Sequence, residues 1–182
     1  MPDPAKPPAK PPATDPGPGP AAPAVEHPQD MLCFALYAAE HAMGRIYRPL
    51  LEPLGLTYPQ YLVLMALGAA APLSLRALGD AVALESNTLT PLLKRMERAG
   101  LLTRRRNPQD ERALQVALTP AGRALRARAK NVQARVAEAT GMRLAELADL
   151  RDRITALRRN LDQALERAET AGAGQFDQIS DS

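Results

Sequence analysis

The sequence predicts a mainly α-helical domain that carries one small β-hairpin. Apolar residues recur at spacings of three and four through most of residues 29–170, which is the periodicity of amphipathic helices. The exception is a pair of short strand-like runs, "LLTRRR" and "LQVALT", separated by the turn-forming residues of "NPQDERA". With 182 residues, 46% of them apolar and 24% charged, the chain fits one domain with a single core and tails.

The two ends of the chain differ in composition from this middle region. Residues 1–28 hold 11 of the 18 prolines and few large apolar side chains, so we expect a disordered tail there and a flexible tail over 171–182. The longest apolar run, "YLVLMALGAAA", is shorter than a membrane span, and the N-terminus lacks the apolar core of a secretory signal. We therefore expect a cytoplasmic protein that makes no use of a membrane.

The first helix is expected to begin at Asp30, a natural N-cap, and to end near Leu50. Its apolar residues follow at helical spacing at positions 32, 36, 39, 43 and 46. Pro49 and Pro53 mark its end, because proline disrupts the helix interior. We assign residues 29–56 to this helix and its connection.

Three short helices are expected next. The first starts after Thr57-Tyr58-Pro59, where the proline suits the first helical turn, and the second follows Ser74. The third starts at Ser86, which is a favourable N-cap residue. The third has an apolar stripe and is expected to end at Gly100; the stripe consists of Leu89, Leu92, Leu93 and Met96. Two short helices joined by a tight turn form a helix-turn-helix, and a hairpin directly after them makes the unit winged. We therefore predict a winged helix-turn-helix over residues 57–118.

Helical pattern resumes after the hairpin, where Thr119 is a favourable N-cap and Pro120 suits the first helical position. Large apolar residues then recur with charged flanks along 143–169, at Leu144, Leu147, Leu150, Ile154, Leu157, Leu161 and Leu165. This narrow stripe suits helix pairing, either between two chains or within one chain. We expect residues 29–56 and 119–170 to form a dimerisation region.

Basic residues are concentrated on the predicted winged unit. Residues 94–112 contain seven basic and three acidic side chains, a net charge of +4, against +3 for the whole chain. Small polar groups at the start of a recognition helix approach base edges, and cations further along reach phosphates. The candidate DNA-contacting residues are Ser86, Asn87, Thr88, Thr90, Pro91, Lys94, Arg95, Arg106, Asp110 and Arg112.

The hairpin tip offers Arg112 to a minor groove, with Asp110 placed to orient the guanidinium. Two simpler interpretations stay open. The hairpin arginines can act only to keep an exposed loop solvated, and Asp110 and Arg112 can form an isolated surface ion pair.

Asp110, Arg112, Leu118 and Thr119 match a wing motif of Asp-x-Arg followed by a strand and Leu-Thr, and with it residues 30–170 resemble the MarR family of winged-helix repressors. Within that family, "LCFALY", "YRPLLEPLGLTYPQYLVL" and "NTLTPLLKRMERAGLLTR" are similar to the organic hydroperoxide resistance regulators (OhrR) of the one-cysteine type. The resemblance implies a homodimer that reads a palindromic operator in double-stranded DNA. One departure from the family's pattern is "ESNT", which replaces an Asp-Ser-Gly type of sequence in the turn before the recognition helix.

Cys33 is the one cysteine of the chain. A cysteine on an apolar helix stretch is most often a small buried hydrophobe. Here it lies in the expected first turn, where free backbone N–H groups favour a thiolate, and all four tyrosines lie between 37 and 61. The resemblance assigns Cys33 to the redox-sensing position and Tyr47 and Tyr58 to its hydrogen-bonding pair. Tyr37, four residues after Cys33, is placed to pack over the sulfur.

Cys33 and Tyr47 are 14 residues apart, which is about 21 Å along one straight helix, so a contact between them must cross between subunits. We expect an organic hydroperoxide to oxidise Cys33 to a sulfenic acid. Without a second cysteine, the product must become a mixed disulfide with a low-molecular-weight thiol, a sulfenamide or an overoxidised form. Loss of the tyrosine hydrogen bonds would then shift the recognition helices and release the operator.

Two other functions stay open. One is a MarR-type repressor released by a small aromatic ligand, with Cys33 inert. The other is a thiol peroxidase, against which the absence of a resolving cysteine and the presence of a winged unit argue. His27 and His41 share no metal-ligand spacing and no Gly-rich phosphate loop occurs, so we expect no metal and no cofactor. We expect a regulator rather than an enzyme.

Overall fold

The structure, a computed structural model, describes residues 27–68, 72–107 and 110–176. The side chains of residues 107, 110–113 and 171–176 are outside this description. The chain divides into two compact units, one up to Ala39 and one from Glu40 onward. The predicted tails fall largely on residues 1–26 and 177–182, which lie outside the described residues.

The chain enters its first helix through a short 3-10 helix, η1 (Pro28–Asp30), which precedes α1 (Leu32–Leu51). His27 caps η1, since its Nδ1 atom accepts a hydrogen bond from the backbone N–H of Gln29 at 3.4 Å. The prediction that Asp30 caps the first long helix is therefore wrong. Pro28, with its fixed backbone angle, starts a separate helical turn that includes Asp30, so Asp30 does not precede α1 as its cap.

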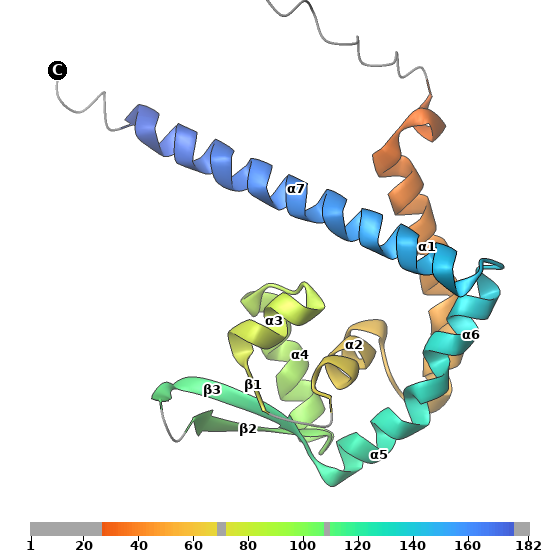
Figure 1. Ribbon diagram of the computed structural model, residues 1–182. Coiled ribbons are helices and arrows are strands. Elements are labelled where there is room, and N and C mark those ends of the chain that lie inside the picture. Colours follow the sequence, from red (N-terminus) through yellow and green to blue (C-terminus); the bar gives the residue numbers. More distant parts are fainter. Residues whose placement is uncertain (1–26, 69–71, 108–109, 177–182) are drawn as a thin grey trace, which may run out of the picture. The chain divides into compact units, whose positions relative to one another are not determined.

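Three helices form the helix-turn-helix region: α2 (Tyr58–Ala66), α3 (Leu75–Val82) and α4 (Ser86–Arg98). They contact one another and group beside a small antiparallel sheet, with the short helix η2 (Glu52–Leu54) leading in from α1 (Figure 1). Within the sheet the strand order is β1 (Leu73–Ser74), β3 (Asp110–Leu118) and β2 (Leu102–Asn107). The predicted hairpin is confirmed as β2 and β3. Strand β1 was not predicted, because two residues are too few to show an alternating pattern.

The predicted N-cap is confirmed at Thr119, and the structure adds Thr57 and Ser74 as the N-caps of α2 and α3. Gln60 completes a capping box on α2 by accepting the backbone N–H of Thr57 at 2.8 Å. At α4 the prediction is wrong by one residue. Glu85 is the N-cap, because its backbone is extended while its carbonyl oxygen already accepts the N–H of Leu89 at 2.8 Å, and Ser86 is the first helical residue.

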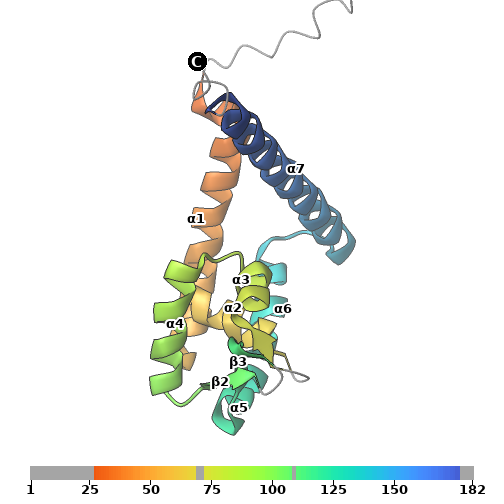
Figure 2. The same cartoon turned by 90° about the vertical axis from the view of Figure 1, so that its left-hand side faces the viewer.

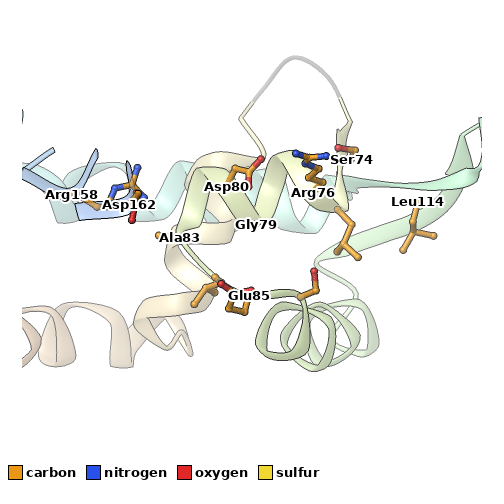
Figure 3. Close-up of a pocket in the computed structure, with 12 residues that line it drawn as sticks. Ser74, Arg76, Gly79, Asp80, Ala83, Glu85, Leu114, Arg158 and Asp162 are labelled. Carbon is orange, nitrogen blue, oxygen red and sulfur yellow. The ribbon is translucent and has the colours of Figure 1, made fainter. Parts of the chain in front are cut away.

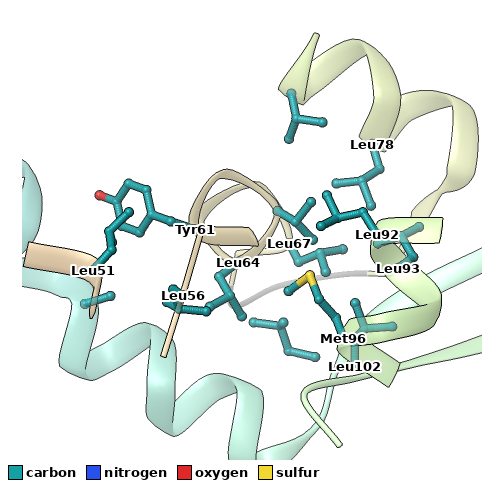
Figure 4. Packing of buried hydrophobic residues seen from close by; sticks show 14 of the residues in the cluster. Leu51, Leu56, Tyr61, Leu64, Leu67, Leu78, Leu92, Leu93, Met96 and Leu102 are labelled. Atoms are coloured by element: carbon teal, nitrogen blue, oxygen red, sulfur yellow. The ribbon is translucent and has the colours of Figure 1, made fainter. Parts of the chain in front are cut away.

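One cluster of buried apolar side chains joins α2, α3 and α4 to the sheet (Figure 4). Leucine dominates it, as the composition indicates. The predicted stripe of α4 is confirmed, since each of its four members is at most 4% exposed: Leu89, Leu92, Leu93 and Met96. Burial of this face fixes the rotation of α4 about its axis and leaves the opposite face exposed.

Beyond the sheet the chain forms α5 (Pro120–Arg128), η3 (Ala129–Asn131), α6 (Val132–Ala139) and α7 (Leu144–Phe176). Figure 2 shows α5 beside the end of the sheet, where β3 leads into it. The Thr119 side chain ties this junction together, since its hydroxyl donates to the Gly100 carbonyl at 2.6 Å and accepts the N–H of Gly122 at 3.0 Å. Helix α7 continues to Phe176, past the end of the predicted apolar stripe.

Candidate nucleic-acid interface and redox site

The exposed face of α4 carries the polar candidates that the sequence places there. Thr90 is half-buried and the other six are exposed: Ser86, Asn87, Thr88, Pro91, Lys94 and Arg95. Near the start of the helix the Thr88 hydroxyl donates to Oδ1 of Asn87 at 3.2 Å, so these two side chains present one polar surface. The packing of α4 therefore directs hydroxyl, amide and cationic groups outward together, as base and phosphate contacts require.

The hairpin continues this cationic surface. Arg105 and Arg106 on β2 are exposed, as is Arg98 at the end of α4. Arg104 differs, because it is half-buried and forms an ion pair with Glu97 in which its Nη2 lies 2.6 Å from Oε2. Asp110 begins β3 opposite Asn107. The side chains of Asp110 and Arg112 lie outside the described set, so their predicted pairing stays a prediction.

A polar groove opens beside the turn between α3 and α4 (Figure 3). Its charged lining mixes both signs, with Arg76 and Arg158 against three carboxylates, Asp80, Glu85 and Asp162. A phosphate needs an excess of positive charge, so this groove is a poor phosphate site compared with the outer face of α4.

Tyr47, Tyr58 and Tyr61 form a compact aromatic cluster between α1 and α2. The ring centroids of Tyr47 and Tyr58 are 4.6 Å apart, and that of Tyr61 lies 5.9 Å from Tyr47 and 6.4 Å from Tyr58. Tyr47 and Tyr61 are buried, whereas Tyr58 is 44% exposed. The structure thus brings together the two tyrosines that the sequence singles out and adds Tyr61, which lies one helical turn after Tyr58.

Burial controls the protonation of this cluster. Desolvation, with smaller repulsion from Tyr58 and Tyr61, raises the pKa of Tyr47 from 10.0 to about 12. Desolvation also raises the pKa of Tyr58, with a further contribution from the charge of Glu40, and raises that of Tyr61. All three hydroxyls are therefore protonated at neutral pH and can donate a hydrogen bond to an anion.

The cluster borders an open cavity and a hydrogen-bond acceptor from a distant part of the chain. Tyr47 and Tyr58 line a cavity of about 470 Å³ together with Gly44 and Leu56. The Tyr47 hydroxyl also donates a hydrogen bond to Oε1 of Gln133 on α6 at 3.4 Å. No sequence signal pointed to Gln133, because it lies 86 residues from Tyr47.

Cys33 is the second residue of α1 and is exposed, not buried as an ordinary core cysteine would be. Tyr37 follows one turn later and is 60% exposed, and its ring centroid lies 6.4 Å from that of Phe34. These residues belong to the unit that ends at Ala39, whereas the tyrosine cluster belongs to the unit that begins at Glu40. A contact of Cys33 with Tyr47 and Tyr58 stays a prediction.

A second cavity, of about 510 Å³, lies between α2 and the helices after the sheet. It is lined by Tyr61, Met65, Arg126, Lys130 and Gln133, among others. The Nε atom of Arg126 is buried and has no hydrogen-bond partner in the described part of the chain. A buried guanidinium donor of this kind favours an anionic partner.

In the described ranges, no set of three or more His, Cys, Asp or Glu side chains is arranged to hold a metal ion. None of the helices described there is both long and apolar enough to cross a membrane.

The fold and the cationic face of α4 and β2 define a winged helix-turn-helix protein, a class that binds DNA. The chain belongs to the MarR family, whose model matches residues 56–114. TtmR, a helix-turn-helix transcriptional regulator of Methylorubrum extorquens, is 46% identical over 130 residues, which cover 71% of this chain and 67% of TtmR. The organic hydroperoxide resistance transcriptional regulator of Bacillus subtilis is 44% identical over 104 residues, which cover 57% of this chain and 71% of that protein.

Solved structures agree with this assignment. Reduced AbfR bound to DNA is 31% identical with a TM-score of 0.62, over 75% of this chain and 94% of AbfR. Overoxidized AbfR has also been solved bound to DNA. BpsR of Bordetella bronchiseptica, whose DNA binding is regulated by 6-hydroxynicotinic acid, is 28% identical with a TM-score of 0.64, over 75% of this chain and 96% of BpsR.

Proposed function

We propose that this protein is a homodimeric transcriptional repressor that releases its operator when an organic hydroperoxide oxidises Cys33. The observation that carries the proposal is the close packing of buried Tyr47 against half-exposed Tyr58, with ring centroids 4.6 Å apart, at the two positions that the OhrR resemblance assigns to thiolate recognition. The similarity to the Bacillus subtilis hydroperoxide regulator and to DNA-bound AbfR supports the same function.

Exposed apolar side chains support the homodimer. On α7, Leu144, Leu161 and Leu165 are 78%, 56% and 63% exposed. Leu32 at the start of α1 is 61% exposed. A row of this kind on long helices is stabilised by pairing with the same row of a second chain, because that removes the apolar surface from water.

In the proposed dimer, Cys33 of the partner subunit enters the cavity beside Tyr47 and Tyr58. The sequence spacing motivates this exchange, because 14 residues on one straight helix would separate Cys33 from Tyr47 of the same chain by about 21 Å. Tyr58 is half-exposed toward that cavity and Tyr47 keeps its proton, so both are donors that favour a thiolate.

Oxidation then proceeds in two balanced steps. The Cys33 thiolate attacks the terminal oxygen of the hydroperoxide, the O–O bond breaks, and the alkoxide takes a proton and leaves as an alcohol. The resulting sulfenic acid condenses with a low-molecular-weight thiol, which forms a mixed disulfide and releases water. Because overoxidized AbfR is found on DNA, we favour this bulkier adduct over further oxygen addition as the form that separates the subunits.

A second function is favoured by the cavity that contains Arg126. The buried, unpartnered Nε of Arg126 and the cation of Lys130 suit a small aromatic carboxylate, and Tyr61 and Met65 suit its ring. BpsR responds to such a compound, 6-hydroxynicotinic acid. In this alternative, binding of the ligand releases the repressor from its operator, and Cys33 has no sensing role.

One titration separates the two functions. The palindromic duplex bound by the wild-type protein is titrated with cumene hydroperoxide plus a low-molecular-weight thiol, and separately with 6-hydroxynicotinic acid. We expect the hydroperoxide to release wild-type protein, and Cys33→Ser to bind the duplex equally well and to stay bound. Release of the Ser variant by hydroperoxide contradicts the proposal, and release by the acid alone favours the alternative.

A further inference from the structure

Glu97 and Arg104 connect the recognition helix, α4, to the wing, which is the hairpin of β2 and β3, through three hydrogen bonds. Glu97 lies in the last turn of α4, and Arg104 lies on β2. Nε and Nη2 of Arg104 donate to Oε2 of Glu97 at 2.9 and 2.6 Å. The backbone N–H of Arg104 donates to Oε1 at 3.1 Å. Both carboxylate oxygens are therefore used, and both the side chain and the main chain of β2 are held.

The position of β2 in the sheet makes this connection important. β2 is an edge strand, because β3 lies between it and β1. Glu97 satisfies a backbone N–H of that edge and holds it against α4. Leu102, 1% exposed, anchors the same strand by apolar packing, but such packing is not directional and leaves the angle of the hairpin weakly defined. The guanidinium–carboxylate pair is directional, so it defines that angle.

A small rotation at this point is magnified toward the hairpin tip. Strand residues advance about 3.3 Å each, so Asn107 lies about 10 Å beyond Arg104. The recognition helix and the wing read different grooves of the same duplex, so the angle between them decides whether both fit at once.

The pairing also changes how the charge of Arg104 is used. Its side chain is 20% exposed and that of Glu97 is 34% exposed, in contrast to the exposed Arg105 and Arg106. Hydrogen bonds from Arg104 lower the pKa of Glu97, so the carboxylate is ionised at every pH at which the protein would meet DNA. The charge of Arg104 is thus paired with the Glu97 carboxylate, a partner that Arg105 and Arg106 do not share.

We propose that Glu97 and Arg104 are a positioning pair that sets the angle of the wing relative to the recognition helix and so determines specificity for the operator, without contacting phosphate. The inference rests on the DNA-binding part of the proposed function and is independent of Cys33.

The test compares binding to two duplexes as a function of salt concentration. One is the palindromic duplex selected by the wild-type protein from a random pool, and the other is a scrambled duplex of the same length. The variants are Glu97→Gln, Arg104→Met and the double variant, with Arg105→Met as the matched control on the neighbouring exposed arginine.

We expect each single variant to lower the ratio of specific to scrambled affinity about tenfold, while scrambled affinity stays within about threefold. For Arg104→Met the slope of log K against log salt should stay at the wild-type value, whereas loss of one phosphate contact makes it shallower by about 0.9. The double variant should lose no more than either single variant, because the two residues act as one unit. Hydroxyl-radical protection of the minor groove should weaken, with protection of guanine N7 in the major groove retained.

Retained affinity for the scrambled duplex shows that the variants are folded. If a variant loses that affinity as well, Glu97→Asp, which shortens the reach by one methylene, should give an intermediate specificity ratio. The inference is overturned if Arg104→Met makes the salt slope shallower by about 0.9, or if folded Glu97→Gln keeps the wild-type specificity ratio. Failure of the wild-type protein to select any duplex would instead contradict the proposed function.

Discussion

Tyr47→Phe tests whether Tyr47 is buried and protonated as the structure indicates. Burial raises the pKa of Tyr47 from 10.0 to about 12, which is about 2 pH units. Each unit corresponds to a difference of about 1.4 kcal/mol between the free energies of deprotonating Tyr47 in the folded and in the unfolded chain. Above pH 10 the unfolded chain loses the Tyr47 proton while the folded protein keeps it. The contribution of Tyr47 to stability is therefore complete below pH 10 and is lost as the pH rises toward 12.

At pH 11 the Tyr47 hydroxyl lowers the free energy of unfolding by about 1.4 kcal/mol for each chain relative to neutral pH. Tyr47→Phe has no such hydroxyl, so its free energy of unfolding should decrease less between pH 8 and pH 11. The measurement is urea unfolding at fixed protein concentration, at pH 8 and pH 11, for wild-type protein and the variant. Tyr37→Phe is the control, since that side chain is 60% exposed, and it should keep the wild-type decrease. An equal decrease in wild-type protein and in Tyr47→Phe would refute the assignment of the raised pKa to a buried Tyr47.

Three further substitutions test other parts of the structure. Gly122→Ala would place a methyl carbon 1.9 Å from the Leu101 carbonyl oxygen, so α5 must move, and urea unfolding should show a loss of about 3 kcal/mol; an unchanged midpoint would contradict this close packing. Gln133→Leu removes the acceptor of the Tyr47 hydroxyl and should lower the free energy of unfolding by about 1 kcal/mol in the same assay; an unchanged value would contradict a stabilising hydrogen bond. Leu161→Lys combined with Leu165→Lys should shift sedimentation from dimer toward monomer, whereas an unchanged dimer would exclude the exposed row of α7 as an interface.

Local signals in the sequence predicted much of the fold. The cap at Thr119, the helix start after Ser74 and the α4 stripe are each encoded within a few residues, so local sequence was sufficient. The prediction of Asp30 as the cap of α1 was wrong because Pro28 starts a separate 3-10 turn that includes Asp30. The prediction of Ser86 as the cap of α4 was wrong because the backbone is extended at Glu85, which precedes the helix although it is a weaker cap residue.

The candidate site was predictable in its residue types but not in its connections. Tyr61 was within reach of sequence analysis, since a residue three positions after Tyr58 on a helix shares its face. Gln133 and the Glu97–Arg104 pair were not, because such contacts depend on how separate elements pack in three dimensions. The spacing of Cys33 and Tyr47 along the sequence was sufficient to predict that a contact between them crosses between subunits.

The most direct test of the redox account is a mixed dimer made from two differently tagged chains. One chain carries Cys33→Ser, and the other carries Tyr47→Phe and Tyr58→Phe, so the remaining thiol faces intact tyrosines only across the interface. We predict that cumene hydroperoxide oxidises this thiol at about the wild-type rate per site. Oxidation as slow as in the homodimer that carries both Phe substitutions would show that the tyrosines do not act on Cys33 of the partner subunit, and would contradict the account.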